Sequence, residues 1–230
     1  PYGMKTNIGF TASGDVNGYT VSYMQTSVDQ FAGMSSARLS VDMGDMGVIA
    51  FDQGSGSGLA TIDDKTPTAA EEIWDGVDTD GTNGANGLVG AAGNSGVWNY
   101  IKSVGGVTLN AAARKGSGTK NADGASSGAG QSGWDFALTG SGDMIGVDGL
   151  SWGAGYGEKE NGAQTVIAAH GTDNGDDEHF TGFLNYSMGG VTVGYQESQI
   201  DKGAAGGVNE TAQAWGIAFA VNDNLSISYG

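Results

Sequence analysis

The densest group of chemically active side chains lies between residues 53 and 96. Seven carboxylates and one lysine occur from Asp63 to Asp80. Acidic side chains that line a narrow passage attract cations and repel anions. Ile73 and Trp74, in the same stretch, are apolar and require burial. We therefore expect the stretch to fold back against the protein, the alternative being an acidic loop in solvent.

A second acidic group lies between the two histidines of the chain. Asp173, Asp176, Asp177 and Glu178 are oxygen donors of the kind that calcium prefers. The regular D-x-D-x-D-G spacing of a calcium loop is missing, so a solvated loop is the favoured interpretation and calcium the weaker one. A zinc site would need a third ligand beyond the two histidines.

No set of residues predicts catalysis, and we expect the protein not to be an enzyme. Residues 124–128 match the G-x-S-x-G pattern of a hydrolase nucleophile, but no strand-to-helix context surrounds them. The run Gly54–Gly58 lacks the Lys-Ser/Thr ending of a phosphate loop. We interpret this run as a flexible hinge into the acidic stretch.

Composition excludes several classes of protein. Nine Lys and Arg face 26 Asp and Glu, a formal net charge of −17, so a nucleic-acid backbone would be repelled. The absence of Cys excludes disulfides and thiolate metal sites. No apolar run approaches the roughly 20 residues of a membrane-spanning helix. With 44 Gly and only 2 Pro, the chain is neither collagen nor a Pro-rich linker.

Alternation of apolar and polar residues predicts strands along the whole chain. Tyr19, Val21 and Tyr23 alternate with Thr20 and Ser22, which places the two sets on opposite faces of one strand. One face of each predicted strand is large and apolar, and the other is small or polar. The same pattern recurs around residues 37–43, 107–113, 134–138, 150–156, 215–219 and 225–229.

Short and long connections alternate between these strands. Four tight turns are predicted at residues 43–46, 103–106, 187–190 and 221–224. Long polar loops are predicted at residues 27–35, 53–96, 115–132, 158–177 and 198–210. This alternation is typical of an all-β, transmembrane, up-and-down antiparallel β-barrel. We expect about twelve strands in a single domain over residues 1–230, with aromatic residues near the strand ends.

Three basic residues lie on the polar face of predicted strands, because they alternate in phase with the polar residues there. They are Lys5, Arg38 and Arg114. On the inner wall of a barrel they could oppose the acidic stretch and create a transverse field. A solvent-exposed position elsewhere would produce the same pattern, so both interpretations stay open.

The stretch from Phe180 to Tyr195, FTGFLNYSMGGVTVGY, resembles the general porins of alphaproteobacteria. The segment Asp63–Glu72 resembles their inward-folded third loop. The resemblance implies a homotrimer of sixteen-stranded barrels in the outer membrane, surrounded by lipid and lipopolysaccharide, that passes small hydrophilic solutes without a cofactor. It implies a constriction loop over residues 53–96 that holds Asp63, Asp64, Glu71, Glu72 and Asp75, with Arg38 and Arg114 on the wall.

The acidic excess favours a preference for cations. The chain departs from the family because it ends in Ser228-Tyr229-Gly230 and not in a strand closed by Phe. About four strands of the family pattern are missing, so we expect the chain to be part of a longer porin. The alternative from another class is a secreted calcium-dependent adhesive or surface-layer β protein, although its fixed repeat is not found.

Overall fold

A computed structural model describes residues 7–28, 33–68, 88–92, 95–116, 132–160, 176–203 and 207–230. Regular structure in these ranges consists of strands and short 3-10 turns. The strands are β1 (Gly9–Val16), β2 (Tyr19–Ser27), β3 (Met34–Asp42), β4 (Val48–Gln53), β5 (Ser95–Val104), β6 (Val107–Arg114), β7 (Gly133–Ser141), β8 (Leu150–Lys159), β9 (Asp177–Met188), β10 (Val191–Asp201), β11 (Glu210–Asn222) and β12 (Leu225–Tyr229). The 3-10 turns are η2 (Gly44–Met46), η3 (Gly58–Ile62) and η4 (Gly142–Ile145).

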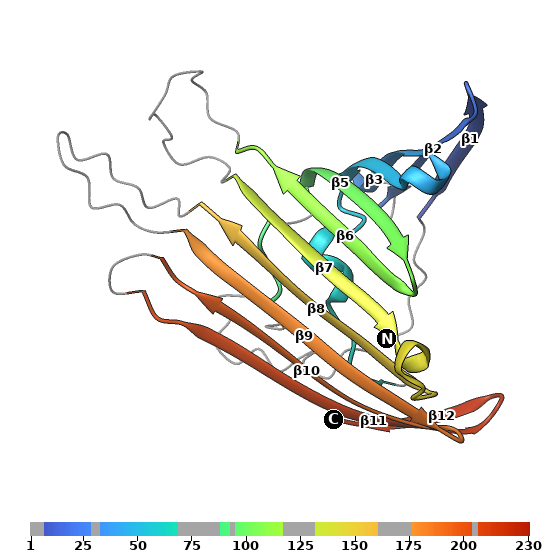
Figure 1. Ribbon diagram of the computed structural model, residues 1–230, viewed down its shortest axis with the longest axis vertical. Coiled ribbons are helices and arrows are strands. Elements are labelled where there is room, and N and C mark those ends of the chain that lie inside the picture. Colours follow the sequence, from blue (N-terminus) through green and yellow to red (C-terminus); the bar gives the residue numbers. More distant parts are fainter. Residues whose placement is uncertain are drawn as a thin grey trace.

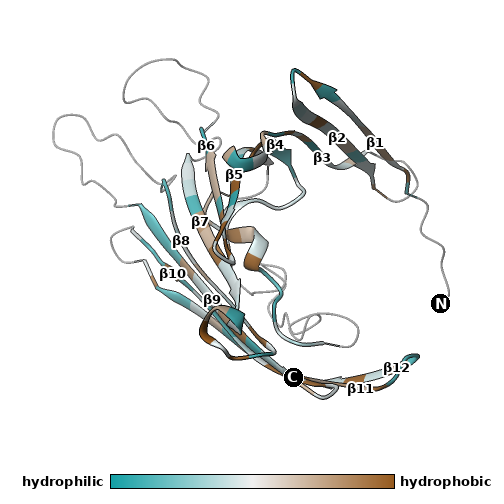
Figure 2. Ribbon diagram, turned by 45° about the vertical axis from the view of Figure 1, so that its right-hand side comes forward, coloured by the Kyte–Doolittle hydropathy of each residue, from teal (hydrophilic) through white to brown (hydrophobic). Residues whose placement is uncertain are grey.

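The twelve strands form one antiparallel sheet in which each strand pairs with its neighbours in sequence, from β1 to β12. The predicted all-β, up-and-down architecture is therefore confirmed, and the described residues contain the predicted number of about twelve strands. The sheet is strongly curved and has a concave face (Figures 1 and 2). Among the described residues β1 pairs only with β2, and β12 only with β11. Closure of the sheet into a barrel stays a prediction.

The connections alternate in length as predicted. Two-residue turns join β5 to β6 and β9 to β10, and the glycines in both turns, at 105–106 and 189–190, have positive φ. Two strands are longer than the sequence indicated, because β8 continues to Lys159 and β10 to Asp201. The sequence predicts loops for the polar residues at these ends, but backbone pairing does not require apolar side chains.

The convex face of the sheet carries the large apolar side chains. The paired registers keep these residues in phase, for instance Leu39 opposite Phe51, and Phe51 opposite Trp98. Trp98 is 60% exposed and Trp215 is 53% exposed. An apolar face of this extent, spread over consecutive strands, is the arrangement of a surface that contacts lipid.

The concave face carries small and polar residues, and the buried core of the described chain lies there. Its main cluster joins Leu59 and Ile62 of η3 to Val89, Ala91 and Ala137. The sheet therefore holds its core on the face that is poorer in large apolar side chains.

Among the described residues, no helix has the length and apolar character needed to cross a bilayer.

Candidate functional site

Two pieces of the connection between β4 and β5 lie against the concave face. We call residues 54–68 and 88–92 together the inner segment. Its 3-10 turn η3 contacts β6, β7, β8 and β9, and Figure 2 shows the sheet curving around this turn. The inner segment thus crosses several strands of the wall on the inside of the curve.

The inner segment starts at an ion pair on the wall. Asp52, which is fully buried, accepts hydrogen bonds from the Ser57 hydroxyl at 2.7 Å and from the Ser55 backbone N–H at 3.1 Å. The Arg38 guanidinium lies 3.8 Å from the same carboxylate and donates to Asn99 Oδ1 at 2.6 Å. Both serines are therefore hydrogen-bonded to Asp52, so the Gly54–Gly58 run, interpreted from the sequence as a flexible hinge, is attached to the wall in the structure. Its glycines are needed for the backbone route, since Gly54, Gly56 and Gly58 all have positive φ.

A buried aspartate on β7 binds both pieces of the inner segment, which we call the first limb (residues 54–68) and the second limb (residues 88–92). Asp135 Oδ1 accepts a hydrogen bond from the Leu59 N–H at 3.0 Å, and Oδ2 accepts one from the Ala92 N–H at 2.9 Å. Asn110 Oδ1 accepts from the Gly58 N–H at 2.8 Å. A carboxylate that receives backbone N–H groups from residues 59 and 92 brings these two distant positions together on the wall.

The first limb continues to β9, β10 and β11. Gln196 accepts from the Lys65 N–H at 2.7 Å and donates to the Ile62 carbonyl at 3.2 Å. Asn185 donates to the Lys65 carbonyl at 2.6 Å. Each amide side chain pairs with backbone groups that no strand partner could satisfy, which fixes the path of residues 62–65.

The second limb is held by β9 and β10. The Ser198 hydroxyl donates to the Leu88 carbonyl at 2.9 Å. His179 is 4% exposed, and its Nδ1 lies 3.2 Å from both the Val89 carbonyl and the Ala91 N–H. Its Nε2 is buried without a hydrogen-bond partner. Both limbs therefore rest on polar side chains of the concave face.

Glycines on β8 make room for the inner segment. A Cβ at Gly155 would overlap the Leu59 side chain, and one at Gly157 would overlap Ala91 and the Asp135 side chain. Further along, a Cβ at Gly194 would overlap Pro67. The bare polar face that the sequence indicated for β8 is therefore the surface on which the inner segment lies.

The structure describes two of the five acidic residues predicted for the constriction. Asp63 and Asp64 lie in the first limb, directly after η3, with Asp63 half-buried and Asp64 exposed. The Asp63 carboxylate accepts from the Asp64 N–H at 3.1 Å, and Asp64 has a positive φ of 51°. Glu71, Glu72 and Asp75 lie outside the described residues.

The structure describes two of the three predicted wall cations, and both belong to the concave face of the sheet. Arg38 is part of the ion pair with Asp52 at the start of the inner segment. Arg114 is half-buried near the long connections, where it is a charged neighbour of Lys159 together with Lys202 and Asp177. Lys5 lies outside the described residues.

The calcium candidates do not form a cluster where the structure describes them. Asp177 and Glu178 belong to β9 and not to a loop, so their side chains project to opposite faces. Asp177 accepts from the Gly203 N–H at 3.0 Å, and Glu178 from the Tyr156 hydroxyl at 3.3 Å. Within the described ranges, no group of three or more His, Asp or Glu side chains is placed to hold a metal ion. Asp173 lies outside these ranges.

Sequence reasoning missed the residues that attach the inner segment to the wall. They are Asn110, Asp135, His179, Asn185, Gln196 and Ser198. The sequence contained a signal for them, because the alternation along the strands places them on the same face of the sheet as the glycines of β8. Polar side chains with several donors or acceptors next to bare positions indicate contact with another backbone.

Comparison with known proteins supports the fold. No protein-family model matches the sequence, and no curated protein matches it. Among solved structures, the chain is similar to in-vitro folded OmpT, an outer membrane protein of Vibrio cholerae, with a TM-score of 0.57 and 15% identity. The match covers 95% of this chain and 64% of that protein, so the chain spans less than two thirds of its length. A loop L8 deletion mutant of OmpT gives a TM-score of 0.39 at 13% identity, covering 94% of this chain and 80% of that one.

The likeness to OmpT shows a fold of the outer-membrane β-barrel type. It agrees with the location in the outer membrane that the sequence predicted. The apolar convex face and the polar concave face are the two surfaces that such a fold requires. The chain is therefore an all-β protein whose curved, up-and-down antiparallel sheet is similar to those of outer-membrane β-barrels.

Proposed function

We propose that this chain forms the wall and the constriction of an outer-membrane porin, a water-filled channel for passive diffusion of small hydrophilic solutes and ions. The observation that carries the proposal is the inner segment on the concave face. A barrel with a polar interior holds water, and a segment that crosses the interior reduces the width of the open passage.

The chemistry of the two faces supports a channel. Large apolar side chains cover the convex face, where lipid would contact them, and the concave face offers amides, hydroxyls and charges to water. Several backbone groups of the inner segment, among them the N–H groups of Leu59, Lys65 and Ala92, are hydrogen-bonded to the wall, which supports a segment held in position inside an aqueous pore.

Charge supports a preference for cations. Asp63 and Asp64 lie on the inner segment, and the whole chain carries a formal net charge of −17. Negative side chains near the narrowest part of a pore raise the local concentration of cations and exclude anions. The proposal includes no enzymatic activity and no cofactor.

The proposal extends to the assembly. The resemblance to alphaproteobacterial general porins supports a homotrimer of sixteen-stranded barrels, of which this chain supplies twelve strands. Lipid and lipopolysaccharide would then contact the convex face outside the interface between subunits.

The test is conductance of the detergent-folded native protein in a planar lipid bilayer, with a salt gradient across the membrane. We expect stepwise current increases in groups of three and a reversal potential of the sign that cation preference gives. Folded protein that inserts into the bilayer and carries no current would refute the proposal.

A further inference from the structure

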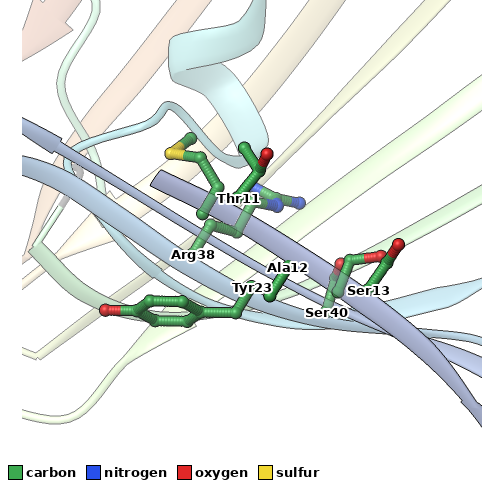
Figure 3. Close-up of a pocket in the computed structure, with 8 residues that line it drawn as sticks. Thr11, Ala12, Ser13, Tyr23, Arg38 and Ser40 are labelled. Atoms are coloured by element: carbon green, nitrogen blue, oxygen red, sulfur yellow. The ribbon is translucent and has the colours of Figure 1, made fainter. Parts of the chain in front are cut away.

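A hollow of about 290 Å³ opens on the concave face of β1, β2 and β3, away from the η3 crossing. Its concave-face lining consists of Thr11, Ser13, Ser22, Met24, Arg38 and Ser40. Figure 3 shows Thr11 and the Arg38 guanidinium on one side of the strands and the Tyr23 ring on the other. The hollow therefore belongs to the polar face and not to the apolar one.

Three of the hydroxyls form a straight row across the strands. Ser13 of β1 is paired with Ser22 of β2, and Ser22 is paired with Ser40 of β3. Adjacent strands lie about 4.8 Å apart, so the three hydroxyls recur at this spacing. This spacing is comparable to the separation of hydroxyls on alternate carbons of a sugar ring.

The hydroxyls that line the hollow have unused hydrogen-bonding capacity. Within the described ranges, Thr11, Ser13, Ser22 and Ser40 make no side-chain hydrogen bond to another residue. By contrast, the hydroxyls of Ser187 and Thr192 on β9 and β10 are paired with each other at 2.9 Å. A hydroxyl both donates and accepts, so this row can bind groups that also do both.

The charges around the hollow select against ionic ligands. The Arg38 guanidinium is the cation of the lining, and the buried Asp52 carboxylate 3.8 Å away compensates its charge. Arg38 is also engaged with Asn99. The lining contains no carboxylate that would attract a cation. A neutral ligand rich in hydroxyls fits this chemistry better than an anion or a cation.

We propose that the β1–β3 hollow is a binding site for neutral polyhydroxylated solutes, namely sugars and polyols, on the wall of the channel. The inference rests on the proposed function, because it treats the concave face as the water-filled side. It names a class of solute that would be retained on the wall during diffusion.

The test measures binding without requiring conductance. D-Glucose is added to the detergent-folded native protein, and saturation-transfer NMR reports contact, with 1,4-dioxane as an uncharged solute that has no hydroxyl. We expect a saturable signal from glucose and none from dioxane. The double variant Ser22→Ala/Ser40→Ala should weaken glucose binding by about fivefold for each hydroxyl removed, the usual net effect of a hydrogen bond.

The matched control is Ser187→Ala/Thr192→Ala, which removes two hydroxyls from the concave face outside the hollow and should leave glucose binding unchanged. Equal weakening in both double variants, or no glucose signal from the native protein, would overturn the inference. Glucose binding to a protein that carries no current would support the site and refute the channel, so the two failures are distinguishable.

Discussion

The carboxylate of Asp135 has two hydrogen-bonding oxygens, and each receives a backbone N–H from a different limb of the inner segment. The side chain is 2% exposed, so water competes poorly for these bonds. A buried N–H that loses its acceptor costs the full desolvation of that group. At the scale of single residues, this aspartate therefore ties the two limbs of the inner segment to one point on the wall.

Replacement of Asp135 by Ala should lower the free energy of unfolding by about 2–6 kcal/mol, because two buried N–H groups lose their acceptor at about 1–3 kcal/mol each. Urea unfolding of the detergent-folded protein measures the change. Asp148→Ala, at an exposed position between η4 and β8, is the control and should have little effect. Equal stability of the two variants would show that Asp135 does not hold the inner segment.

The glycines of β8 provide a second test at this scale. Gly155→Ala should destabilise the protein by about 1–3 kcal/mol, the usual cost of overpacking, because the added methyl overlaps Leu59 and the Phe136 carbonyl. Gly14→Ala on β1 is the matched control, since a Cβ there meets nothing within 4 Å. The two variants are compared by thermal unfolding, and a Gly155→Ala protein as stable as the control would contradict the packing of η3 on β8.

At the scale of elements, the strands were predictable and the path of the inner segment was not. Period-two alternation and short glycine turns are local signals, so the strands around Tyr23 or Trp215 could be assigned from adjacent residues. The inner segment is fixed by bonds between residues far apart in sequence, such as Lys65 to Gln196. No local pattern encodes these pairs, although the glycines of β8 marked the surface that receives them.

The first limb carries the described part of the predicted selectivity region. Asp63→Asn/Asp64→Asn should shift the reversal potential towards zero in a salt gradient, since two negative charges are removed from the inner segment. Asp223→Asn in the turn between β11 and β12 removes a charge far from the inner segment and should leave the potential unchanged. An unchanged potential in the double variant, with normal conductance, would refute the role of these two carboxylates.

At the scale of the whole molecule, the assignment of lipid and water to the two faces determines every functional statement. Ile217 and Ala218 are neighbours on β11, but they project to the convex and the concave face respectively. Ile217→Arg should destabilise the protein by about 2–4 kcal/mol if it lies near the middle of the bilayer. Ala218→Arg should be tolerated in a water-filled interior.

Both arginine variants are folded into lipid vesicles, and their unfolding is compared with that of the native chain. The difference between the two variants is informative because both place an arginine on the same strand at nearly the same depth, and only the face of the sheet differs. A larger loss in Ala218→Arg than in Ile217→Arg would reverse the assignment of the two faces.

The central claim is that the inner segment narrows an open passage. Because Asp135 binds both Leu59 and Ala92, a variant in which a short glycine linker replaces residues 60–91 keeps the two N–H groups that Asp135 binds and removes the rest of the inner segment. The decisive measurement is the single-channel conductance of this deletion variant beside the native protein in the same bilayer. The account predicts a larger conductance and weaker cation preference in the variant, whereas equal conductance from two correctly folded proteins would contradict it.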